Sequence, residues 1–285
     1  MSIDNKHWIT EVCEGAGIAF SFKMKAKVHE EQTPFQKLEI YETEEFGYLM
    51  LLDGFMMLTS RDNFLYHEMM SHPALFSHPD PKKVVIIGGG DCGTLREVLK
   101  HTTVELAHQI DIDERVTRLS EKYFPELCES NDDPRAKLDF IDGVAWMKTV
   151  APGSIDVIII DSTDPIGPGE GLFSTAFYQD CFKALSDHGI IVQQSESPLL
   201  HFETIIQPMY QKFAKAGFVD TQTFHFPQPC YPSGWWSATM AIKNGALDSF
   251  REQDARDKTF ATRYYTSDLH KAAKVPPAFM KEKTC

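Results

Sequence analysis

The first sixty residues place apolar and polar side chains in short alternating runs separated by turn residues. The runs cover 19–31, 35–43 and 47–54, and a further apolar stretch follows at 55–60. Alternation with a period of two is typical of strands that bury one face against a core. The pattern therefore predicts a small all-β domain over residues 1–60.

Helical spacing replaces this alternation after residue 60. Apolar residues recur at helical intervals over 61–78, and a proline-marked stretch then leads to Lys83. Because prolines interrupt regular structure, we expect 61–81 to form a connecting helix and a linker.

From residue 82 onward, strand-like and helix-like segments alternate. The expected strands cover 84–88, 104–113, 136–142, 155–161 and 189–194. The expected helices cover 94–101, 114–124, 143–150, 174–185 and 203–217, the last of them despite Pro208. Strands that are apolar at nearly every position belong to parallel sheets covered on both faces. Residues 82–285 are thus predicted to form an α/β domain, with 218–226 and 235–242 adding an antiparallel hairpin at one edge.

The charge of the chain narrows the partners that it can bind. It has 285 residues, 42% of them hydrophobic, and 28 Lys and Arg against 41 Asp and Glu, which gives a formal charge of -13. A nucleic-acid binder would be basic, so no nucleic-acid partner is expected. An acidic surface favours cationic ligands, although solubility alone would also explain it.

The cysteines and the apolar runs indicate a cytoplasmic location. The six cysteines are scattered, with no C-x-x-C pair and no zinc-finger spacing, as is usual in a reducing compartment. No apolar run is long enough to span a bilayer, and the polar N-terminus has no signal core. We therefore expect a cytoplasmic protein with no membrane partner.

A glycine-rich turn follows the strand at 84–88. Gly88, Gly90 and Gly93 satisfy G-x-G-x-x-G, the spacing of a dinucleotide-binding turn. Asp91, however, stands in the turn where a pyrophosphate would lie. A carboxylate there would repel a phosphate, so the glycines are expected to allow a ligand without phosphate to approach the backbone.

Carboxylates follow all five expected parallel strands. They are Asp91, Asp111, Asp113, Asp142, Asp161, Asp164, Glu170 and Glu196. The carboxyl ends of parallel strands meet at one edge of a sheet, where ligands bind. Helix capping would account for Asp113 and for Asp142. The remaining acids would repel one another unless a positive ligand enters.

These acids fit a positively charged nucleoside better than a metal ion. Asp161 and Asp164 offer two oxygens, but no calcium loop or histidine triad accompanies them, so no metal is expected. Asp111 lies where a carboxylate can hold ribose hydroxyls, and Asp142 can accept from an adenine amino group. The same acids disfavour the carboxylate of S-adenosylmethionine. The cleft is therefore expected to select the decarboxylated sulfonium.

Several stretches carry a resemblance to a known family. They are LLDGFMMLTSRDNFLYHEMMSHPAL, VVIIGGGDCGTLREVLKH, DDPRAKLDFIDG, VIIIDSTDPIGPGEGLFSTAFY and YPSGWW. Over roughly residues 8–245 the chain resembles the spermidine synthases, the polyamine aminopropyltransferase family. The resemblance implies a small N-terminal β domain on a Rossmann-like domain of the class I methyltransferase type. It also implies a homodimer or homotetramer.

The same resemblance implies the reaction. The aminopropyl group of decarboxylated S-adenosylmethionine moves to putrescine, giving spermidine and 5′-methylthioadenosine by direct displacement. The sulfonium nucleoside is a co-substrate, so neither a cofactor nor a metal is implied.

The resemblance also implies roles for individual residues. The donor would contact Gln36, His67, Asp91, Asp111, Asp142, Gly143 and Pro168. The attacking amine would contact Tyr66, Asp161, Asp164 and Tyr231, with Asp161, Asp164 and Tyr66 as the catalytic group. The walls of the acceptor tunnel would be Trp8, Glu196 and Trp236, with Glu196 taking the distal ammonium.

Three positions depart from the family pattern. Asp111 stands where a glutamate is usual, Cys92 where a glycine is common in the turn, and Gly171 where a serine is frequent. The shorter acid and the Cys92 side chain would affect substrate affinity, but no charged group is lost from the expected reaction centre.

Alternatives stay open at this point. The same fold would serve a methyltransferase that uses S-adenosylmethionine, or a polyamine-binding protein without turnover. Turn formation alone would explain the aspartates around Pro165. A core position would explain His67 equally well, and the pair Trp235 and Trp236 is more typical of a core than of a ligand wall.

Overall fold

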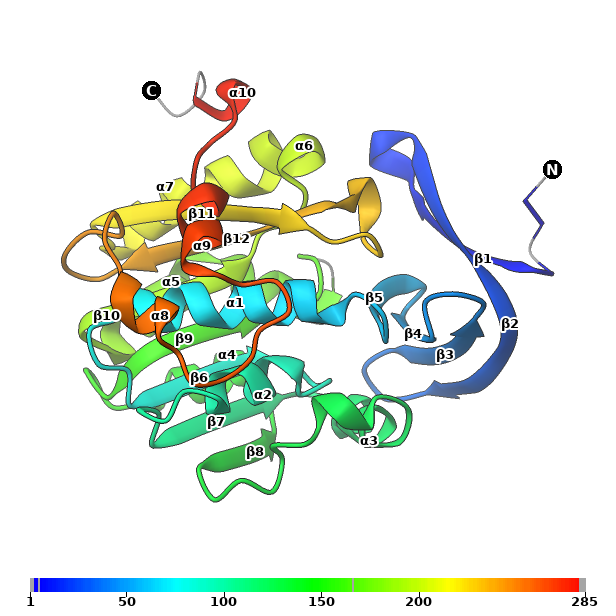
Figure 1. Cartoon of the computed structure of the whole chain (residues 1–285), viewed down its shortest axis with the longest axis horizontal. Coiled ribbons are helices and arrows are strands. Elements are labelled where there is room, and N and C mark those ends of the chain that lie inside the picture. Colours follow the sequence, from blue (N-terminus) through cyan, green and yellow to red (C-terminus); the bar gives the residue numbers. More distant parts are fainter. Residues whose placement is uncertain (1–2, 5, 166, 282–285) are drawn as a thin grey trace.

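The computed structural model describes residues 3–4, 6–165 and 167–281, which form two β-sheets flanked by helices (Figure 1). The N-terminal sheet has five antiparallel strands in the order in which they follow along the chain. These are β1 (Trp8–Cys13), β2 (Ile18–Gln32), β3 (Lys37–Thr43), β4 (Tyr48–Leu52) and β5 (Phe55–Thr59). The predicted all-β N-terminal region is confirmed, with β1 as a strand that the alternation had not distinguished.

The second sheet has seven strands in the order β11-β12-β10-β9-β6-β7-β8. They are β6 (Lys83–Gly88), β7 (Leu106–Asp111), β8 (Ala136–Phe140), β9 (Ile155–Asp161), β10 (Leu185–Gln194), β11 (Asp220–Pro227) and β12 (Trp235–Ile242). Strands β6 to β10 pair in parallel, and β11 and β12 add an antiparallel edge next to β10. The predicted Rossmann-like α/β class and the edge hairpin are confirmed. The division into units at residues 60 and 81 stays a prediction.

The helices lie between and beside these strands. They are α1 (Asn63–Ser77), α2 (Gly93–Leu99), α3 (Glu114–Tyr123), α4 (Gly143–Met147), α5 (Thr175–Ala184), α6 (Pro198–His201), α7 (Gln207–Ala216), α8 (Glu252–Arg256), α9 (Ser267–Ala273) and α10 (Ala278–Lys281). The helix expected over 203–217 is a π-helical turn at Phe202–Ile206 followed by α7. Pro208 falls in the first turn of α7, directly after the π-helical turn.

The central strands are buried on both faces, as their continuous apolar sequence predicts. In β9, Val157 and Ile159 pack into the cluster formed with α1 and α2, while Ile158 and Ile160 pack into the cluster formed with α5 and α7. Successive side chains of a strand point to opposite faces, so each face of β9 receives apolar residues. The two helical layers hold the strand ends in fixed positions.

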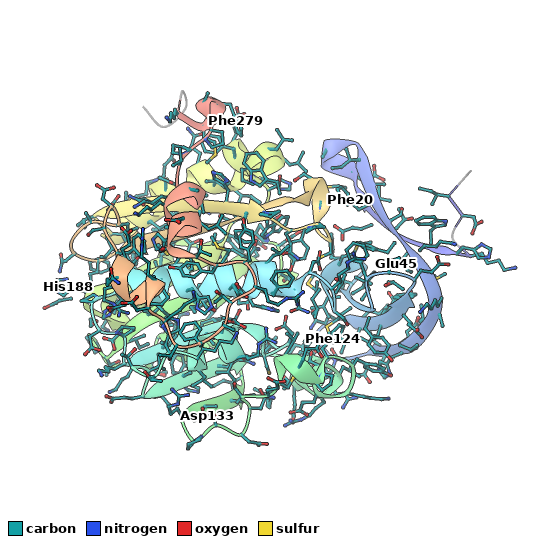
Figure 2. All side chains as sticks on the ribbon, in the orientation of Figure 1. Phe20, Glu45, Phe124, Asp133, His188 and Phe279 are labelled. Atoms are coloured by element: carbon teal, nitrogen blue, oxygen red, sulfur yellow. The ribbon has the colours of Figure 1, made fainter. Side chains whose placement is uncertain are left out.

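The N-terminal sheet packs beside the carboxyl ends of these strands (Figure 1). Leu38, Ile40 and Met50 share one apolar cluster with residues of α3 and with Phe124. Phe124, labelled in Figure 2, lies where α3 meets this sheet and packs edge-on against Tyr48 at 6.2 Å between ring centroids. Met50 and Val116 of the same cluster line the space above the strand ends.

The segment after β12 folds back over α1 (Figure 1). The buried Glu68 carboxylate of α1 accepts hydrogen bonds from three consecutive backbone N–H groups, those of Arg263, Tyr264 and Tyr265, at 2.7, 2.9 and 2.7 Å. Tyr265 is buried and stacks on Phe76 at 5.7 Å between ring centroids. The sequence pattern gave little indication of this arrangement, because its anchor is a single buried charge.

Within the described ranges, none of the helices combines the length with the apolar content that crossing a bilayer requires.

We expect Glu68→Gln to lower the free energy of unfolding by about 2–3 kcal/mol, because the new amide nitrogen cannot accept the backbone N–H groups. Urea denaturation of this variant beside the exposed-site control Glu129→Gln measures the difference. Equal stability of the two variants would contradict the role given to Glu68.

Candidate active site

A cavity of about 280 Å³ lies at the carboxyl ends of β6, β7, β8 and β9, beneath the N-terminal sheet. Its acidic lining residues are Asp53, Asp91, Asp111, Asp142, Asp161 and Asp164. Among the described residues that line it, none is Lys, Arg or His. The polar side of the cavity therefore carries carboxylates without a neighbouring cation in the lining.

Asp161 is the last residue of β9, and both of its carboxylate oxygens accept hydrogen bonds. Tyr66 donates its hydroxyl to Oδ1 at 2.7 Å, and Thr94 donates its hydroxyl to Oδ2 at 2.6 Å. Burial and the nearby Asp91 raise the pKa of Asp161, and the two hydroxyl groups act in the opposite direction. The donors come from α1 and α2, so two helices fix the orientation of this carboxylate.

Asp91 lies in the glycine turn and is held by the start of α2 and by α1. Its Oδ1 accepts from the Gly93 N–H at 2.7 Å, and its Oδ2 lies 3.2 Å from Nε2 of His67. Burial alone would raise the pKa of Asp91, but the charge and hydrogen bond of His67 lower it. Burial likewise opposes protonation of His67, yet Asp91 raises the pKa of that ring. The two residues form an ion pair in which His67 is buried and Asp91 is partly exposed to the cavity.

Two glycines allow this close arrangement. A Cβ on Gly93 would lie 2.2 Å from Cε1 of His67, and a Cβ on Gly88 would lie 2.1 Å from the backbone oxygen of Asp161. Gly88 also has a φ of +83°, which other residues rarely adopt. The glycines thus serve the contacts between helix, turn and strand.

Asp111 ends β7 and accepts the Asp113 N–H at 2.7 Å through its Oδ1. Burial, followed by repulsion from Asp113 and Asp161, raises the pKa of Asp111 to about 6. Asp113 caps α3, as predicted, and accepts from Thr33 at 2.7 Å and from Gln36 at 3.1 Å. This carboxylate ties the N-terminal sheet to the cavity wall, where Gln36 lies.

Asp142 caps α4 and also lines the cavity. Its Oδ1 accepts from the N–H groups of Val144 and Ala145 at 2.8 and 3.1 Å. Gly143, which follows it, lines the cavity as well. The capping explanation and the binding explanation are therefore compatible, because the second oxygen takes no part in the cap.

A second acidic group adjoins Asp164. Glu196 follows β10 with a φ of +64°, and it is almost completely buried. Burial and a hydrogen bond with Asp164 raise the pKa of Glu196 well above its ordinary value. Glu11 of β1 is also buried, and burial, with a smaller effect of Asp164, raises its pKa to about 7. The sequence had not indicated Glu11, because β1 is more than 150 residues away along the chain.

Most of the predicted site residues lie together. Those that line the cavity are Gln36, Tyr66, Asp91, Asp111, Asp142, Gly143, Asp161, Asp164 and Tyr231. Tyr231 donates to the Met57 carbonyl at 2.6 Å and packs edge-on against Tyr66. The side chain of Pro168 lies outside the described residues, so its predicted contact stays a prediction.

Other predicted residues do not line the cavity. His67 and Trp236 form a layer behind it, His67 on Asp91 and Trp236 on Tyr231 at 4.5 Å between ring centroids. Trp8 begins β1 opposite Lys23, and Glu196 is buried beside Asp164. Of the strand-end acids, Glu170 is exposed and points to no wall of this cavity. The prediction that all five strand ends supply one acidic rim is therefore correct for β6 to β9, whereas Glu196 after β10 and the exposed Glu170 are not among the described lining residues.

Two further features were missed. Thr94 looks like an ordinary residue of the first turn of α2, and only its distance to Asp161 distinguishes it. The apolar wall consists of Phe35, Met50, Leu52, Phe55, Met57 and Leu58 from the N-terminal sheet. In the sequence these residues are strand and turn positions, with no signal that they face a ligand space.

The chemistry of the cavity suits a ligand with an apolar part and positive charges. In the part of the chain that the structure describes, no three His, Cys, Asp or Glu side chains are grouped as metal ligands would be. A positive ligand would relieve the repulsion among the carboxylates, and an anionic one would add to it.

Two family models match the chain. The spermine/spermidine synthase domain matches residues 63–251, and the spermidine synthase tetramerisation domain matches residues 7–60. A polyamine aminopropyltransferase of Thioalkalivibrio sulfidiphilus is 65% identical over 283 residues, which is 99% of both chains. One of Methylococcus capsulatus is 60% identical over 276 residues, covering 97% of this chain and 96% of the relative.

Solved structures agree with these matches. A spermidine synthase in complex with the transition-state analogue AdoDATO is 36% identical, covers 98% of this chain and 95% of its own, and superposes with a TM-score of 0.93. The spermidine synthase of Thermotoga maritima is also 36% identical, covers 96% of this chain and 93% of its own, and has a TM-score of 0.90. The chain therefore belongs to the polyamine aminopropyltransferase family of enzymes.

Proposed function

We propose that the enzyme transfers the aminopropyl group of decarboxylated S-adenosylmethionine to putrescine, giving spermidine and 5′-methylthioadenosine. The observation that carries this proposal is the cavity with six aspartates and, among its described lining residues, no basic side chain. A donor with a sulfonium and an ammonium satisfies these carboxylates, whereas phosphate and carboxylate groups would be repelled.

The donor would lie along the ends of β6, β7 and β8. Asp111 would hold the ribose hydroxyls, and Asp142 with Gly143 would hold the adenine between apolar side chains such as Leu172. Asp91 would hold the aminopropyl ammonium, with His67 positioning its carboxylate from behind. Because the leaving sulfonium is part of the donor, the reaction needs no cofactor.

The transfer would be a single displacement. The lone pair of the amine nitrogen attacks the carbon next to the sulfonium, the carbon–sulfur bond breaks, and its electrons stay on sulfur as a neutral thioether. Most of the catalysis would come from holding the nitrogen about 3–3.5 Å from that carbon. Asp161 would accept the proton that the attacking nitrogen loses, and Tyr66 would fix the carboxylate that receives it.

The amine must be neutral to attack. A free alkylamine resembles lysine, with a pKa of about 10.4, so the cavity must favour loss of its proton. The adjacent sulfonium charge and desolvation both lower an amine pKa. Burial and Asp91 raise the pKa of Asp161, which makes this carboxylate a better acceptor for the proton.

The far end of putrescine needs a partner of its own. Glu196 and Glu11, both buried, adjoin Asp164, and burial raises the pKa of each. The distal ammonium of putrescine would lower the pKa of these two carboxyl groups, and the resulting carboxylates would bind the ammonium. Trp8 and Trp236, which are not among the described lining residues, would contribute from the surroundings.

We also propose that the enzyme is a homodimer or homotetramer that assembles through its N-terminal sheet. The match of residues 7–60 to a family model described as a tetramerisation domain supports this proposal.

Product analysis tests the proposed reaction. The enzyme is incubated with putrescine and either decarboxylated or intact S-adenosylmethionine, and we expect 5′-methylthioadenosine and spermidine only with the decarboxylated donor. Cadaverine, agmatine and spermidine in place of putrescine test the acceptor, and we expect slower turnover with each. S-adenosylhomocysteine as the product would instead indicate a methyltransferase, and tight binding without any product would indicate a binding protein.

We expect Asp161→Asn to lower kcat by about 10²–10⁴-fold, because the amide has nearly the same shape but cannot accept the proton. Binding of 5′-methylthioadenosine, measured by calorimetry, should survive. The exposed-site control Asp187→Asn should keep full activity. Full turnover by Asp161→Asn would remove this residue from the proposed role.

We expect Thr94→Val to lower kcat at neutral pH by about ten- to a hundredfold, because Asp161 loses one of the two hydroxyl donors that fix its orientation toward the amine. The hydrogen bond from Thr94 lowers the pKa of Asp161, so its loss should raise the pKa further and move the acid limb of the kcat profile to higher pH. Thr94→Ser keeps the hydroxyl and should restore the profile. An acid limb at the same pH in all three proteins would show that Thr94 does not act through Asp161.

A further inference from the structure

The turn that joins β2 to β3, residues 33–36, brings two side chains to the cavity. Phe35 and Gln36 both line it, although 40% of the surface of Phe35 stays exposed. The Thr33 hydroxyl oxygen closes the turn by accepting from the N–H groups of Phe35 and Gln36, each at 3.1 Å. The positions of both lining side chains therefore depend on where Thr33 is held.

A single buried carboxylate beside the other sheet holds this turn. Asp113, which is 2% exposed, accepts through Oδ2 from the Thr33 hydroxyl at 2.7 Å and from Nε2 of Gln36 at 3.1 Å. Its Oδ1 accepts from the Arg115 N–H at 3.1 Å, at the start of α3. Its own N–H donates to Oδ1 of Asp111 at 2.7 Å. One residue thus connects the turn with an acid that lines the cavity.

The same carboxylate decides which way the Gln36 amide points. The nitrogen and the oxygen of a glutamine amide have nearly the same shape, so the partners of the amide set its orientation. A carboxylate that takes three donors can only accept, so the amide nitrogen must face Asp113. None of the described residues donates a hydrogen bond to Oε1 of Gln36. Because Gln36 lines the cavity, this oxygen is the part of the amide that remains for a ligand.

We propose that Asp113 is a positioning residue for the nucleoside donor, because it turns the Gln36 amide so that an accepting oxygen is available near Asp111. In this proposal, which rests on the proposed function, Asp113 acts from behind the lining residues. Two neighbouring acceptors suit two adjacent hydroxyl groups, such as those of a ribose. With the amide reversed, one hydroxyl would lose its acceptor inside the cavity.

A second contact joins the same two segments without touching the amide. Arg115 of α3 donates to the Glu31 carboxylate of β2 at 2.7 and 3.1 Å, on the exposed side of the contact. Exposed ion pairs contribute little to stability. Removal of this pair is therefore the control for a role that is limited to joining the two sheets.

Replacing the acid by an amide tests the orientation. Asp113→Asn keeps a side chain that caps helices well, but its amide nitrogen would donate to Gln36 and turn that amide round. We expect the KM for the decarboxylated donor and the Kd of 5′-methylthioadenosine, measured by calorimetry, to rise about tenfold or more. The KM for putrescine should stay unchanged. Glu31→Gln should leave all three constants unchanged.

Exchanging the acid and the amide separates positioning from packing. In the double variant Asp113→Asn with Gln36→Glu, the carboxylate at position 36 accepts from the amide nitrogen at position 113 and still offers an oxygen to the ligand. We expect its donor affinity to recover to within about threefold of the wild type. Gln36→Glu alone places two carboxylates against each other and should weaken donor binding. Urea denaturation of every variant checks that it is folded.

Equal donor affinity of Asp113→Asn and the wild type would overturn the proposal. A double variant that binds no better than Asp113→Asn, or an equal loss in Glu31→Gln, would overturn it as well. If Asp113→Asn does not fold, the double variant and Gln36→Glu give the same comparison, and equal affinity of these two would overturn the proposal. A wild-type enzyme that binds 5′-methylthioadenosine but makes no spermidine would refute the proposed function and leave the affinities as the test of Asp113.

Discussion

The site depends on the repulsion among carboxylates that the strand ends bring together away from water. Asp161 and Asp91 adjoin each other at the ends of β9 and β6, and Asp111 joins them from β7. Bringing like charges into a low-dielectric cavity costs free energy that some other contact must offset. Part of the compensation is internal, since His67 pairs with Asp91 and two hydroxyl groups hold Asp161. The rest of the compensation would come from the positively charged groups of the bound substrates.

Helix α1 connects this electrostatic arrangement with the rest of the fold. Three consecutive residues of this helix each contact a different part of the molecule, because neighbouring side chains of a helix point about 100° apart. Tyr66 reaches Asp161 in the cavity, His67 pairs with Asp91 behind the turn, and Glu68 anchors the C-terminal segment on the outside. A shift of α1 would thus disturb three things together: the carboxylate of Asp161, the glycine turn that carries Asp91, and the C-terminal segment.

The sequence was sufficient to predict the parallel sheet and most of the acidic residues of the cavity, and the reason is physical. Continuous apolar strands must be covered on both faces, and the carboxyl ends of parallel strands share one edge, so Asp91, Asp111, Asp142 and Asp161 had to lie together. It was insufficient where a role depends on a contact between distant segments. Glu11 feels the charge of Asp164 although β1 belongs to the other sheet, and Thr94 gains its role from a single 2.6 Å hydrogen bond. Which residues contact each substrate stays a prediction.

Selection against a carboxylate is the central claim, and comparative calorimetry measures it most directly. The two titrants are decarboxylated and intact S-adenosylmethionine, which differ only in the carboxylate that would approach the aspartates of the turn. At an effective dielectric constant of about 20, one unfavourable charge contact near 4 Å costs about 4 kcal/mol before screening. We predict that the decarboxylated donor binds on the order of a hundredfold more tightly. Equal dissociation constants, or tighter binding of the intact donor, would contradict the account.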